Sequence, residues 1–397
     1  MMQPTTAFID IQNMLHNIGV VRTCAPHCDL IAMVKANAYG HGVVEICKAL
    51  SAAGIDKLGV ATFEEGVFLR ERGILGTILI TAGANWMRGV KDLVHHQLTP
   101  WIASAEEVAL LRETLRGSDK PFDVHLDVDT GMSRNGLYFR ADHQSHVHTI
   151  RLLKETPALH VAAACTHFAT PDAEDDHYLN EQIHLFVSAL DYLATENICP
   201  KVIHASNSAA VLRGVNSSLS FLPTRFPNKT FWVRPGMMLY GVNPFLRDIA
   251  APILRPILKW VAPVVVRKQI AKGSFAGYGC TWQAQRDTEI AVLGVGYGDG
   301  YHRLNSNRGQ VLIAGRRAPI VGRVSMDMTV VDVSDIIEEL GMGSCALGQM
   351  ATLIGADEED EITAVEVAEW CETISYEVLT TISQRVVRKY ISTNIDY

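Results

Sequence analysis

Short apolar runs alternate with amphipathic stretches from Leu30 to Val233, and this regularity leaves few folds open to the 397-residue chain. Eight runs rich in β-branched residues are predicted strands: Leu30–Val34, Lys57–Ala61, Thr77–Thr81, Leu98–Ile102, Phe122–Val128, Leu159–Cys165, Lys201–His204 and Thr230–Val233. The stretches between them include the predicted helices Val43–Ala53, Glu64–Arg72, Ala105–Arg116 and His177–Glu196. Such alternation predicts a parallel sheet, and eight units within about 220 residues fit a (β/α)8 barrel better than an open sheet.

The pattern changes after the proline-rich segment Asn243–Pro256. Strand-like runs separated by turns follow: Leu258–Ile270, Thr288–Gly300, Gln310–Gly315, Ala318–Val333 and Met350–Ala356. These indicate an antiparallel β-domain, and the segments Ile362–Cys371 and Ser375–Val386 are predicted to be helical. The predicted fold is therefore α/β, with a TIM-type barrel over residues 9–243 and a mainly antiparallel β-domain over residues 244–397. Residues 1–8 are expected to pack with the second domain.

The charge balance argues against some partners. The chain has 35 lysines and arginines against 43 acidic residues, a formal charge of −8, so it lacks the overall basic footprint that nucleic acid or an anionic membrane surface requires. No apolar run approaches the roughly 18 residues of a spanning helix, and the first residues lack a secretion-signal pattern. We expect a cytoplasmic protein with reduced cysteines. Cys24 and Cys28 flank His27, but no second pair follows at zinc-like spacing, so no metal site is expected.

In a (β/α)8 barrel the active site lies where the strands end and the next loops begin. Polar residues at such positions are Lys35 and Tyr39 after the first strand, Arg134 after the fifth, His167 after the sixth, Asn207 and Ser208 after the seventh, and Arg234 and Gly236 after the eighth. The last two loops are the usual phosphate site, and they offer the Ser208 hydroxyl and the amides of Gly236 and Met237. A phosphate near a strand-end lysine points to pyridoxal phosphate on a Schiff base, although such a lysine alone is more often only solvated.

The segment VKANAYGHG, which contains Lys35, resembles the cofactor-lysine signature of alanine racemases. Further matches follow in order along nearly the whole chain: DTGMSR, THFATPD, NSAA, VRPGMMLYG, GYGCTW, GYGDGY, GRVSMDM and SYEVLTTISQRV. The resemblance implies a fold-type III pyridoxal-phosphate isomerase that interconverts L-alanine and D-alanine and supplies D-alanine for peptidoglycan. It also implies a head-to-tail homodimer in which the β-domain of each subunit completes the active site of the other.

The resemblance further implies a role for individual residues. Lys35 would carry the cofactor as an internal aldimine and act as one acid/base group, and Tyr278 from the second subunit would act as the other. Without the resemblance, Tyr278 would be interpreted as an aromatic residue that packs in a turn. Tyr39, Ser208, Gly236, Met237 and Tyr376 would hold the phosphate, and Arg234 would face the pyridine nitrogen. His167 would contact the cofactor and lie between Arg234 and Tyr278. Arg134 and the backbone of Met326 would hold the substrate carboxylate, and Arg134 would also reach the cofactor hydroxyl. The entryway would contain Asp172, Tyr297, Tyr301, Arg303, Asp327 and Ile374.

These residue types suit racemisation. Removing a proton from one face of Cα and returning one to the other needs two groups, which Lys35 and Tyr278 can provide. A tyrosine has an unperturbed pKa of about 10, so its phenolate needs positive neighbours, and His167 backed by Arg234 is expected to supply that field. Arginine stays protonated and cannot accept a hydrogen bond. Arg234 therefore implies an unprotonated pyridine nitrogen, which weakens the electron sink and is expected to suppress transamination.

The chain departs from the family at Asp127. Many members have a carbamylated lysine seven residues before the arginine of the DTGM motif, and its negative charge braces that arginine. Here the position is an aspartate, so we expect Asp127 to orient Arg134, directly or through water, with activity independent of dissolved CO2. The alternative is that Asp127 has no functional role and is simply a surface residue of a strand.

Other functions compete with alanine racemisation. MSRNG, after the TG of the DTGM motif, also resembles racemases of broader specificity that act on serine or larger residues. Tyr376, Arg303 and Ile374 keep the alanine-type pattern, which favours alanine, with serine as a slower substrate. A non-catalytic pyridoxal-phosphate carrier would leave the β-domain unexplained, and a fold-type III decarboxylase should place an acid, not Arg234, at the pyridine nitrogen.

Overall fold

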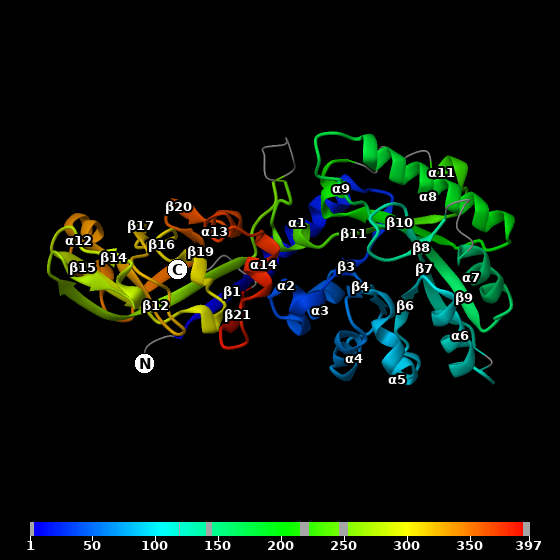
Figure 1. The fold of residues 1–397 in the computed structure, drawn as a ribbon, viewed down its shortest axis with the longest axis horizontal. Helices are drawn as coiled ribbons and strands as arrows, with labels where there is room; N and C mark the ends of the chain where they lie inside the picture. Colours follow the sequence, from blue (N-terminus) through cyan, green and yellow to red (C-terminus); the bar gives the residue numbers. More distant parts are fainter. Residues whose placement is uncertain (1–3, 119, 140–144, 215–221, 246–252, 392–397) are drawn as a thin grey trace.

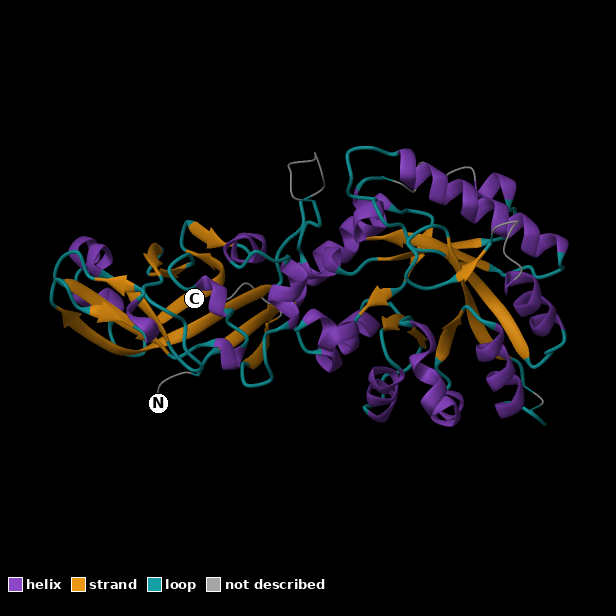
Figure 2. Ribbon diagram, in the orientation of Figure 1, coloured by secondary structure: helices purple, strands orange, loops and turns teal. Residues whose placement is uncertain are grey.

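The structure is a computed structural model that describes residues 4–118, 120–139, 145–214, 222–245 and 253–391. The molecule is elongated, with a barrel ringed by helices at one end and a domain built mostly of strands at the other (Figure 1 and Figure 2). The predicted fold class, a parallel barrel followed by a mainly antiparallel domain, is confirmed.

Each of the eight predicted barrel strands is present, and the first is broken into two short pieces. The sheet runs in the order β2-β11-β10-β9-β7-β6-β5-β4-β3. Because β2 pairs with β11 and β3 pairs with β4, the two pieces of the first strand join the ends of the row. The strands are β2 (Cys28–Leu30), β3 (Ala32–Met33), β4 (Lys57–Val60), β5 (Thr77–Ile80), β6 (Thr99–Ile102), β7 (Phe122–Asp129), β9 (Leu159–Cys165), β10 (Val202–Asn207) and β11 (Thr230–Arg234), with β8 (Leu137–Tyr138) beside β7.

Helices cover the outside of the barrel because the strands are apolar on both faces and must be buried twice. In chain order, the helices and helical turns of the barrel domain after its first strand are α2 (Lys35–Tyr39), α3 (Val43–Ala52), α4 (Phe63–Glu71), η1 (Gly83–Gly89), α5 (Val90–His95), α6 (Ala105–Thr114), α7 (Ser145–Lys154), α8 (His177–Thr195), α9 (Ser208–Leu212), α11 (Leu222–Arg225) and η2 (Met237–Tyr240). The N-terminal helix α1 (Ile11–Cys24) packs on α9 and η2. It therefore covers the segments that follow the last two strands of the barrel, β10 and β11.

The second sheet joins the two ends of the described chain. Its main path runs in the order β17-β16-β19-β12-β1-β21. The first strand, β1 (Thr6–Asp10), pairs antiparallel with β12 and parallel with β21. The other strands are β12 (Leu258–Ile270), β15 (Thr288–Leu293), β16 (Gln310–Ile313), β17 (Arg316–Pro319), β18 (Thr329–Asp332), β19 (Met350–Asp357), β20 (Asp360–Ile362) and β21 (Val387–Ile391). A separate hairpin consists of β13 (Phe275–Ala276) and β14 (Trp282–Gln283).

Short helices complete the β-domain, and the last of them is shorter than the sequence predicted. They are η3 (Tyr278–Cys280), η4 (Tyr297–Asp299), η5 (Arg303–Asn305), α12 (Ser334–Leu340), η6 (Met342–Cys345), α13 (Ala364–Trp370) and α14 (Ser375–Thr380). The predicted helix Ser375–Val386 stops at Thr380, and β21 then begins at Val387. Residues 381–386 instead form turns that lead into β21, which pairs with β1 in a long-range contact that local periodicity does not encode.

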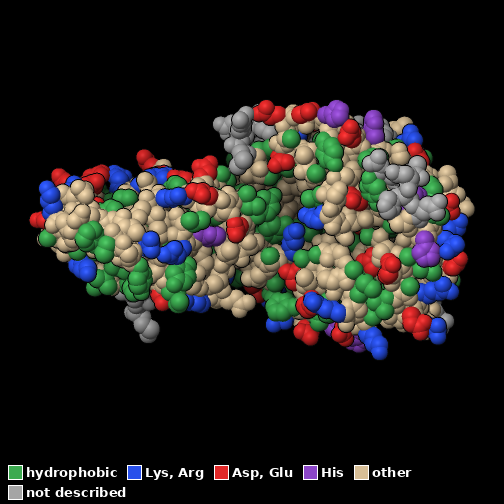
Figure 3. All heavy atoms as spheres, in the orientation of Figure 1, with side chains coloured by type: hydrophobic (Ala, Val, Ile, Leu, Met, Phe, Trp, Pro, Cys, Tyr) green, Lys and Arg blue, Asp and Glu red, His purple; other side chains and the backbone are tan. Residues whose placement is uncertain are grey.

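No helix within the described residues is both long and apolar enough to cross a membrane. On the face shown in Figure 3, acidic and basic side chains are interspersed over both domains.

Candidate active site

A cavity of about 840 Å³ opens at the carboxyl ends of the barrel strands, within the size range of small-molecule sites. It brings together all nine residues that the sequence predicted to contact a cofactor: Lys35, Tyr39, Arg134, His167, Ser208, Arg234, Gly236, Met237 and Tyr376. Asp172 and Ile374, predicted at an entryway, line the same cavity. Residues of α14 thus close the cavity from the side of the β-domain.

Lys35 begins a left-handed turn directly after β3. Ala36, Asn37, Ala38 and Tyr39 have φ between 51° and 55°, a conformation that costs L-residues about 1–2 kcal/mol each. Such strain persists only where surrounding structure enforces it and is common at functional sites. The strained turn therefore indicates that the surrounding structure holds Lys35 in a defined position.

Glu65 of α4 holds the start of this turn. Its Oε1 accepts a hydrogen bond from the amide of Ala36 at 2.6 Å, and its Oε2 accepts one from the amide of Ala61 at 2.7 Å. Burial and the charge of Arg134 hold the pKa of Lys35 below its usual value, although Glu65 opposes them. A lowered pKa increases the fraction of neutral, nucleophilic amine.

Ser208 and Gly236 form a small polar cradle. The Ser208 hydroxyl oxygen accepts hydrogen bonds from the amides of Gly236 at 2.8 Å and Met238 at 3.3 Å, which leaves its O–H to donate. The Tyr39 hydroxyl lies over Gly236, because a Cβ built there would be 2.5 Å from that oxygen. Burial raises the pKa of Tyr39 and of Tyr376, so both phenols stay protonated and can donate. Such a group of donors suits an anion.

Arg234 ends β11 and donates to several buried acceptors. It is 2% exposed, and its Nη2 donates to the carbonyls of Thr166 at 2.6 Å and Ala205 at 3.0 Å. Its Nη1 donates to Nδ1 of His204 at 2.6 Å, and Nη2 also reaches Nδ1 of His167 at 3.2 Å. A guanidinium only donates, so both rings must present an unprotonated nitrogen to Arg234.

The histidines around Arg234 are neutral. Burial, aided by the charge of Arg234, lowers the pKa of His125 and of His167 to about 3 and that of His204 well below its usual value. His204 Nε2 therefore carries the proton and donates to Nδ1 of His125 at 3.0 Å. Because burial keeps the His167 ring neutral, Arg234 is the charged member of the pair expected to supply the positive field. The positive field comes from Arg234.

Asp127 is buried in β7, 4% exposed, and is not a surface residue. Its Oδ2 accepts a hydrogen bond from Nδ2 of Asn135 at 2.7 Å, and its Oδ1 faces Sγ of Cys165 at 3.8 Å. Burial raises its pKa to about 6, against the opposing charge first of Arg234 and, more weakly, of Arg134. The direct partner is thus Asn135, and the carboxylate acts on Arg134 only at longer range.

The remaining predicted residues lie outside this cavity, on the β-domain. Tyr278 is 72% exposed, and Met326 and Tyr297 are also exposed. Asp327 accepts a hydrogen bond from Arg385 at 2.8 Å. Arg303 is exposed. Tyr301 is wrongly predicted at an entryway: it is 1% exposed and packs edge-on against Trp260 in the domain core.

Sequence reasoning missed several residues around the cavity. Glu65 holds the turn that carries Lys35, and Asn135 and His204 bond to the predicted residues Asp127 and Arg234. Trp101, in β6, lines the cavity with its ring 5.2 Å from the Arg234 guanidinium. Trp101 and His204 could have been found, because both lie in or at the ends of predicted strands. The Glu65 contact has no sequence signal beyond a helix-capping box.

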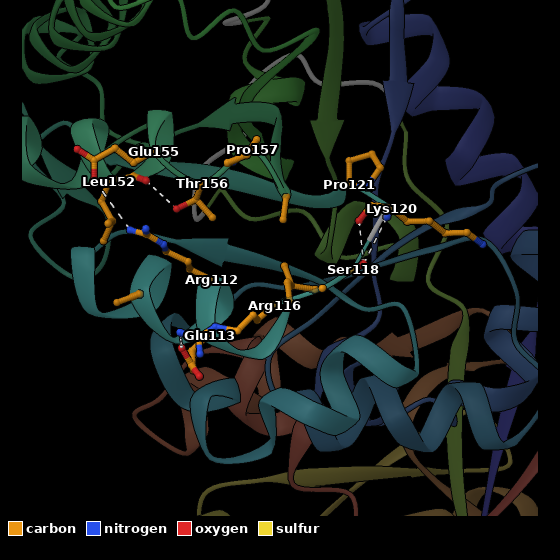
Figure 4. Close-up of a pocket in the computed structure, with 14 residues that line it drawn as sticks. Arg112, Glu113, Arg116, Ser118, Lys120, Pro121, Leu152, Glu155, Thr156 and Pro157 are labelled. Carbon is orange, nitrogen blue, oxygen red and sulfur yellow. Dashed lines mark hydrogen bonds and ion pairs between the residues drawn. The ribbon is translucent and has the colours of Figure 1, made fainter.

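A second cavity of about 660 Å³ lies at the other end of the barrel (Figure 4). It is lined by Pro121 and Pro157, which precede β7 and β9, so it faces the amino ends of the strands. Four of its charged side chains pair with one another, Arg116 with Glu113 at 2.7 Å and Arg112 with Glu155 at 3.9 Å. The amino-end face of such barrels serves stability, not catalysis.

Comparison with known proteins gives one family for both domains. Residues 9–244 match the family model of the alanine racemase N-terminal domain, and residues 257–390 match that of the C-terminal domain. The alanine racemase of Carboxydothermus hydrogenoformans is 38% identical over 98% of this chain and 100% of its own length. The structure of the Bacillus anthracis alanine racemase with bound L-Ala-P has a TM-score of 0.87 at 31% identity, covering 100% of this chain and 97% of that one.

A further structure links this fold to a cofactor. The alanine racemase of Bartonella henselae, solved with covalently bound pyridoxal phosphate, has a TM-score of 0.81 at 26% identity and covers 98% of this chain and 100% of its own. With both domains matched and relatives aligned from end to end, the chain belongs to the alanine racemase family.

Proposed function

We propose that this protein interconverts L-alanine and D-alanine with pyridoxal 5′-phosphate and two acid/base groups, and so supplies D-alanine for peptidoglycan. The observation that carries the proposal is the convergence of Lys35, the anion cradle and Arg234 on one cavity in a chain of this family. We also propose that it works as a cytoplasmic homodimer, with each site completed by the partner.

The residues of the cavity fit pyridoxal phosphate. Ser208, Gly236, Met237, Tyr39 and Tyr376 would hold the phosphate, whose oxygens need several donors. Lys35 would hold the aldehyde carbon through its amine. Arg234 would face the ring nitrogen: among the described residues its Nε–H has no partner, so this donor is free for an acceptor in the cavity. When bound, the cofactor withdraws electron density from the substrate Cα–H bond.

The side chains divide the work of proton transfer. Lys35 would take or return the Cα proton on one face, and Tyr278 would do so on the other. Arg134 and the backbone of Met326 would hold the alanine carboxylate and so fix which faces of Cα the two groups meet. Arg234 stays protonated although burial lowers its pKa, so it can only donate to the ring nitrogen and cannot protonate it fully. Tyr297 and Asp327 would narrow the approach to the site and favour a small side chain.

Chiral chromatography of a panel of L-amino acids, incubated with purified cofactor-loaded protein, tests this function. We expect L-alanine to become racemic far ahead of L-serine. Comparable racemisation of basic or larger residues would instead favour the broader-specificity alternative suggested by MSRNG. A yellow protein that racemises nothing would contradict the racemase assignment and reopen the carrier and decarboxylase readings.

A Gly236→Ala substitution is expected to weaken cofactor binding at least about tenfold, because crowding in a packed site costs roughly 1–3 kcal/mol. The added Cβ would lie 2.5 Å from the Tyr39 hydroxyl and push it out of the cradle. Spectroscopic titration of the apoprotein with pyridoxal phosphate measures the affinity. Gly19→Ala is the matched control, since a Cβ at Gly19 meets no atom within 4 Å. Unchanged affinity for Gly236→Ala would remove Gly236 from the phosphate cradle.

An Asp127→Asn substitution is expected to remove an acid limb from the pH profile of kcat/KM. Asp127 has a pKa of about 6, so its carboxylate is charged above that pH and is neutralised below it, where Arg234 and Arg134 lose their buried counter-charge. The wild type should lose activity as pH falls through 6. The variant should be flat there and about tenfold less active at pH 8, the effect of one lost charge interaction of roughly 1.4 kcal/mol.

The control for this experiment is Asp123→Asn, which removes an exposed carboxylate from the same strand. His125 and His167, with pKa values of about 3, do not titrate in this range. The same acid limb in Asp127→Asn as in the wild type would show that another group causes it. A fully active variant would mean that Asp127 does not support the arginines.

A further inference from the structure

We infer that Asn307 is a positioning residue for Tyr278: its side-chain amide ties the turn that carries Tyr278 to the backbone at Gly322. This inference rests on the proposed acid/base role of Tyr278. Asn307 follows η5 and lies about thirty residues from Tyr278 in sequence, as expected for a long-range contact between neighbouring loops of a sheet domain.

The turn that carries Tyr278 has little support of its own. It forms the tip of the β13–β14 hairpin, a sheet of only two strands, and isolated hairpins are marginally stable. Gly277, Gly279 and Cys280 all have positive φ, at 71°, 74° and 49°. Without contacts from elsewhere, such a tip would sample many conformations, and the Tyr278 hydroxyl would move with it.

A second loop supports this tip through close backbone contact. A Cβ at Gly277 would lie 2.9 Å from the amide nitrogen of Arg323, and one at Gly322 would lie 2.4 Å from the carbonyl oxygen of Ala276. A Cβ at Gly279 would lie 3.1 Å from Nη1 of Arg323. Both loops therefore have glycine where their backbones come too close for a side chain, and the Tyr278 turn packs directly against residues 322–323.

Asn307 links the two loops by hydrogen bonds. Its Oδ1 accepts from the amide of Gly322 at 2.6 Å, and its Nδ2 donates to Oγ1 of Thr281 at 3.1 Å. In the described part of the chain, the bond to Thr281 is the only side-chain hydrogen bond that reaches residues 277–281. Asn307 has a φ of 58°, a conformation that asparagine tolerates better than most residues. The backbone at this position therefore suits asparagine, and the two hydrogen bonds hold its amide across the gap between the loops.

The rate of proton transfer depends on where the Tyr278 hydroxyl lies, because this group must reach Cα of a bound substrate. Misplacing a reacting group by about 1 Å can cost about 100-fold in rate. Tyr278 serves only one face of Cα, with Lys35 on the other. A defect in its placement should therefore slow proton transfer on one face only, which a general loss of structure would not do.

The test uses three variants of the holoenzyme. Asn307→Gly removes the amide and tolerates the positive φ, and Thr281→Val removes the acceptor at the other end of the bond. Asn307→Asp keeps an acceptor for the Gly322 amide and gives the Thr281 hydroxyl an acceptor, so it should restore the link. Asn228→Gly is the matched control, since Asn228 is an exposed asparagine with a φ of 71° just before β11.

We expect kcat to fall about 10- to 100-fold in Asn307→Gly, with little change in KM for alanine. The α-deuterium isotope effect on kcat/KM should rise for one enantiomer of alanine and not for the other. Thr281→Val should change in the same direction, the double variant should be no worse than Asn307→Gly, and Asn307→Asp should keep most activity. In the apoprotein, hydrogen exchange should quicken in a peptide spanning residues 275–283 in Asn307→Gly but not in Asn228→Gly.

Several outcomes would overturn the inference. Wild-type kinetics in both Asn307→Gly and Thr281→Val, or isotope effects that rise equally for both enantiomers, would show that the link does not position Tyr278. If Asn307→Gly does not fold, Thr281→Val alone decides by the same isotope effects. Tyr278→Phe separates this failure from failure of the proposed function: if it remains active, Tyr278 has no acid/base role and the inference falls with it.

Discussion

A Tyr278→Phe variant is expected to lose racemisation by about 10²- to 10⁴-fold, the usual contribution of a positioned acid/base group. Its cofactor absorbance should not change. Only the phenol oxygen is removed, and Tyr278 is 72% exposed and lies outside the cofactor cavity of its own chain. Folding and cofactor loading should therefore be those of the wild type. Chiral chromatography of alanine together with the visible spectrum measures both quantities on one sample.

The control for this variant is Tyr192→Phe, which removes a phenol from the last turn of the outer helix α8. It should leave both the rate and the spectrum unchanged. Near-normal racemisation by Tyr278→Phe would mean that another group returns the proton. Loss of the cofactor band would mean that Tyr278 supports the cofactor site itself, contrary to its exposed position.

Mixing two inactive proteins, Lys35→Ala and Tyr278→Phe, is expected to restore activity after subunits exchange. Lys35 lies in the barrel cavity and Tyr278 on the β-domain outside it. If each site takes its barrel from one subunit and its tyrosine from the other, a mixed dimer has one site with both changes and one with neither. Random pairing in a twofold dimer would then recover about a quarter of the wild-type activity.

The matched control mixes Lys35→Ala with Arg134→Ala, because both residues line the same barrel cavity. Every mixed dimer then has a defect in each barrel, and no activity should return. Assays before and after dissociation and reassociation of the mixture, with size determined by sedimentation, give the result. If the Lys35→Ala and Tyr278→Phe mixture stays inactive although mixed dimers form, each site belongs to a single chain.

The features that follow from barrel topology were the predictable ones. The positions after successive parallel strands meet at one end of a barrel, so Lys35, His167 and Arg234 could be brought together from sequence alone. The charge states could not, because they depend on burial. His167 is neutral only because the packed interior around Arg234 excludes water, and Asp127 meets Asn135 through the tertiary course of the loop after β7.

The local sequence also could not indicate which of two nearby tyrosines is buried. Tyr297 and Tyr301 both belong to the segment GYGDGY, yet Tyr297 is exposed and Tyr301 is buried. Gly300 lies between them with a φ of 95° and packs against the carbonyl of Thr381. That close contact turns the chain inward, and no periodicity of the sequence indicates it.

The pairing of β1 with β12 and β21 has a consequence for how the protein is made. On the ribosome, Thr6–Asp10 emerges before the barrel residues, whereas its neighbour Val387–Ile391 emerges after the whole barrel has been synthesised. Until β12 and then β21 have been synthesised, Ala7 and Ile9 lack the neighbours that bury them in the finished sheet, and unpaired strands are prone to aggregate. Pairing so distant in sequence is slow to form. The second sheet, to which β1 contributes from ahead of the barrel, can therefore be completed only after the barrel residues have been synthesised.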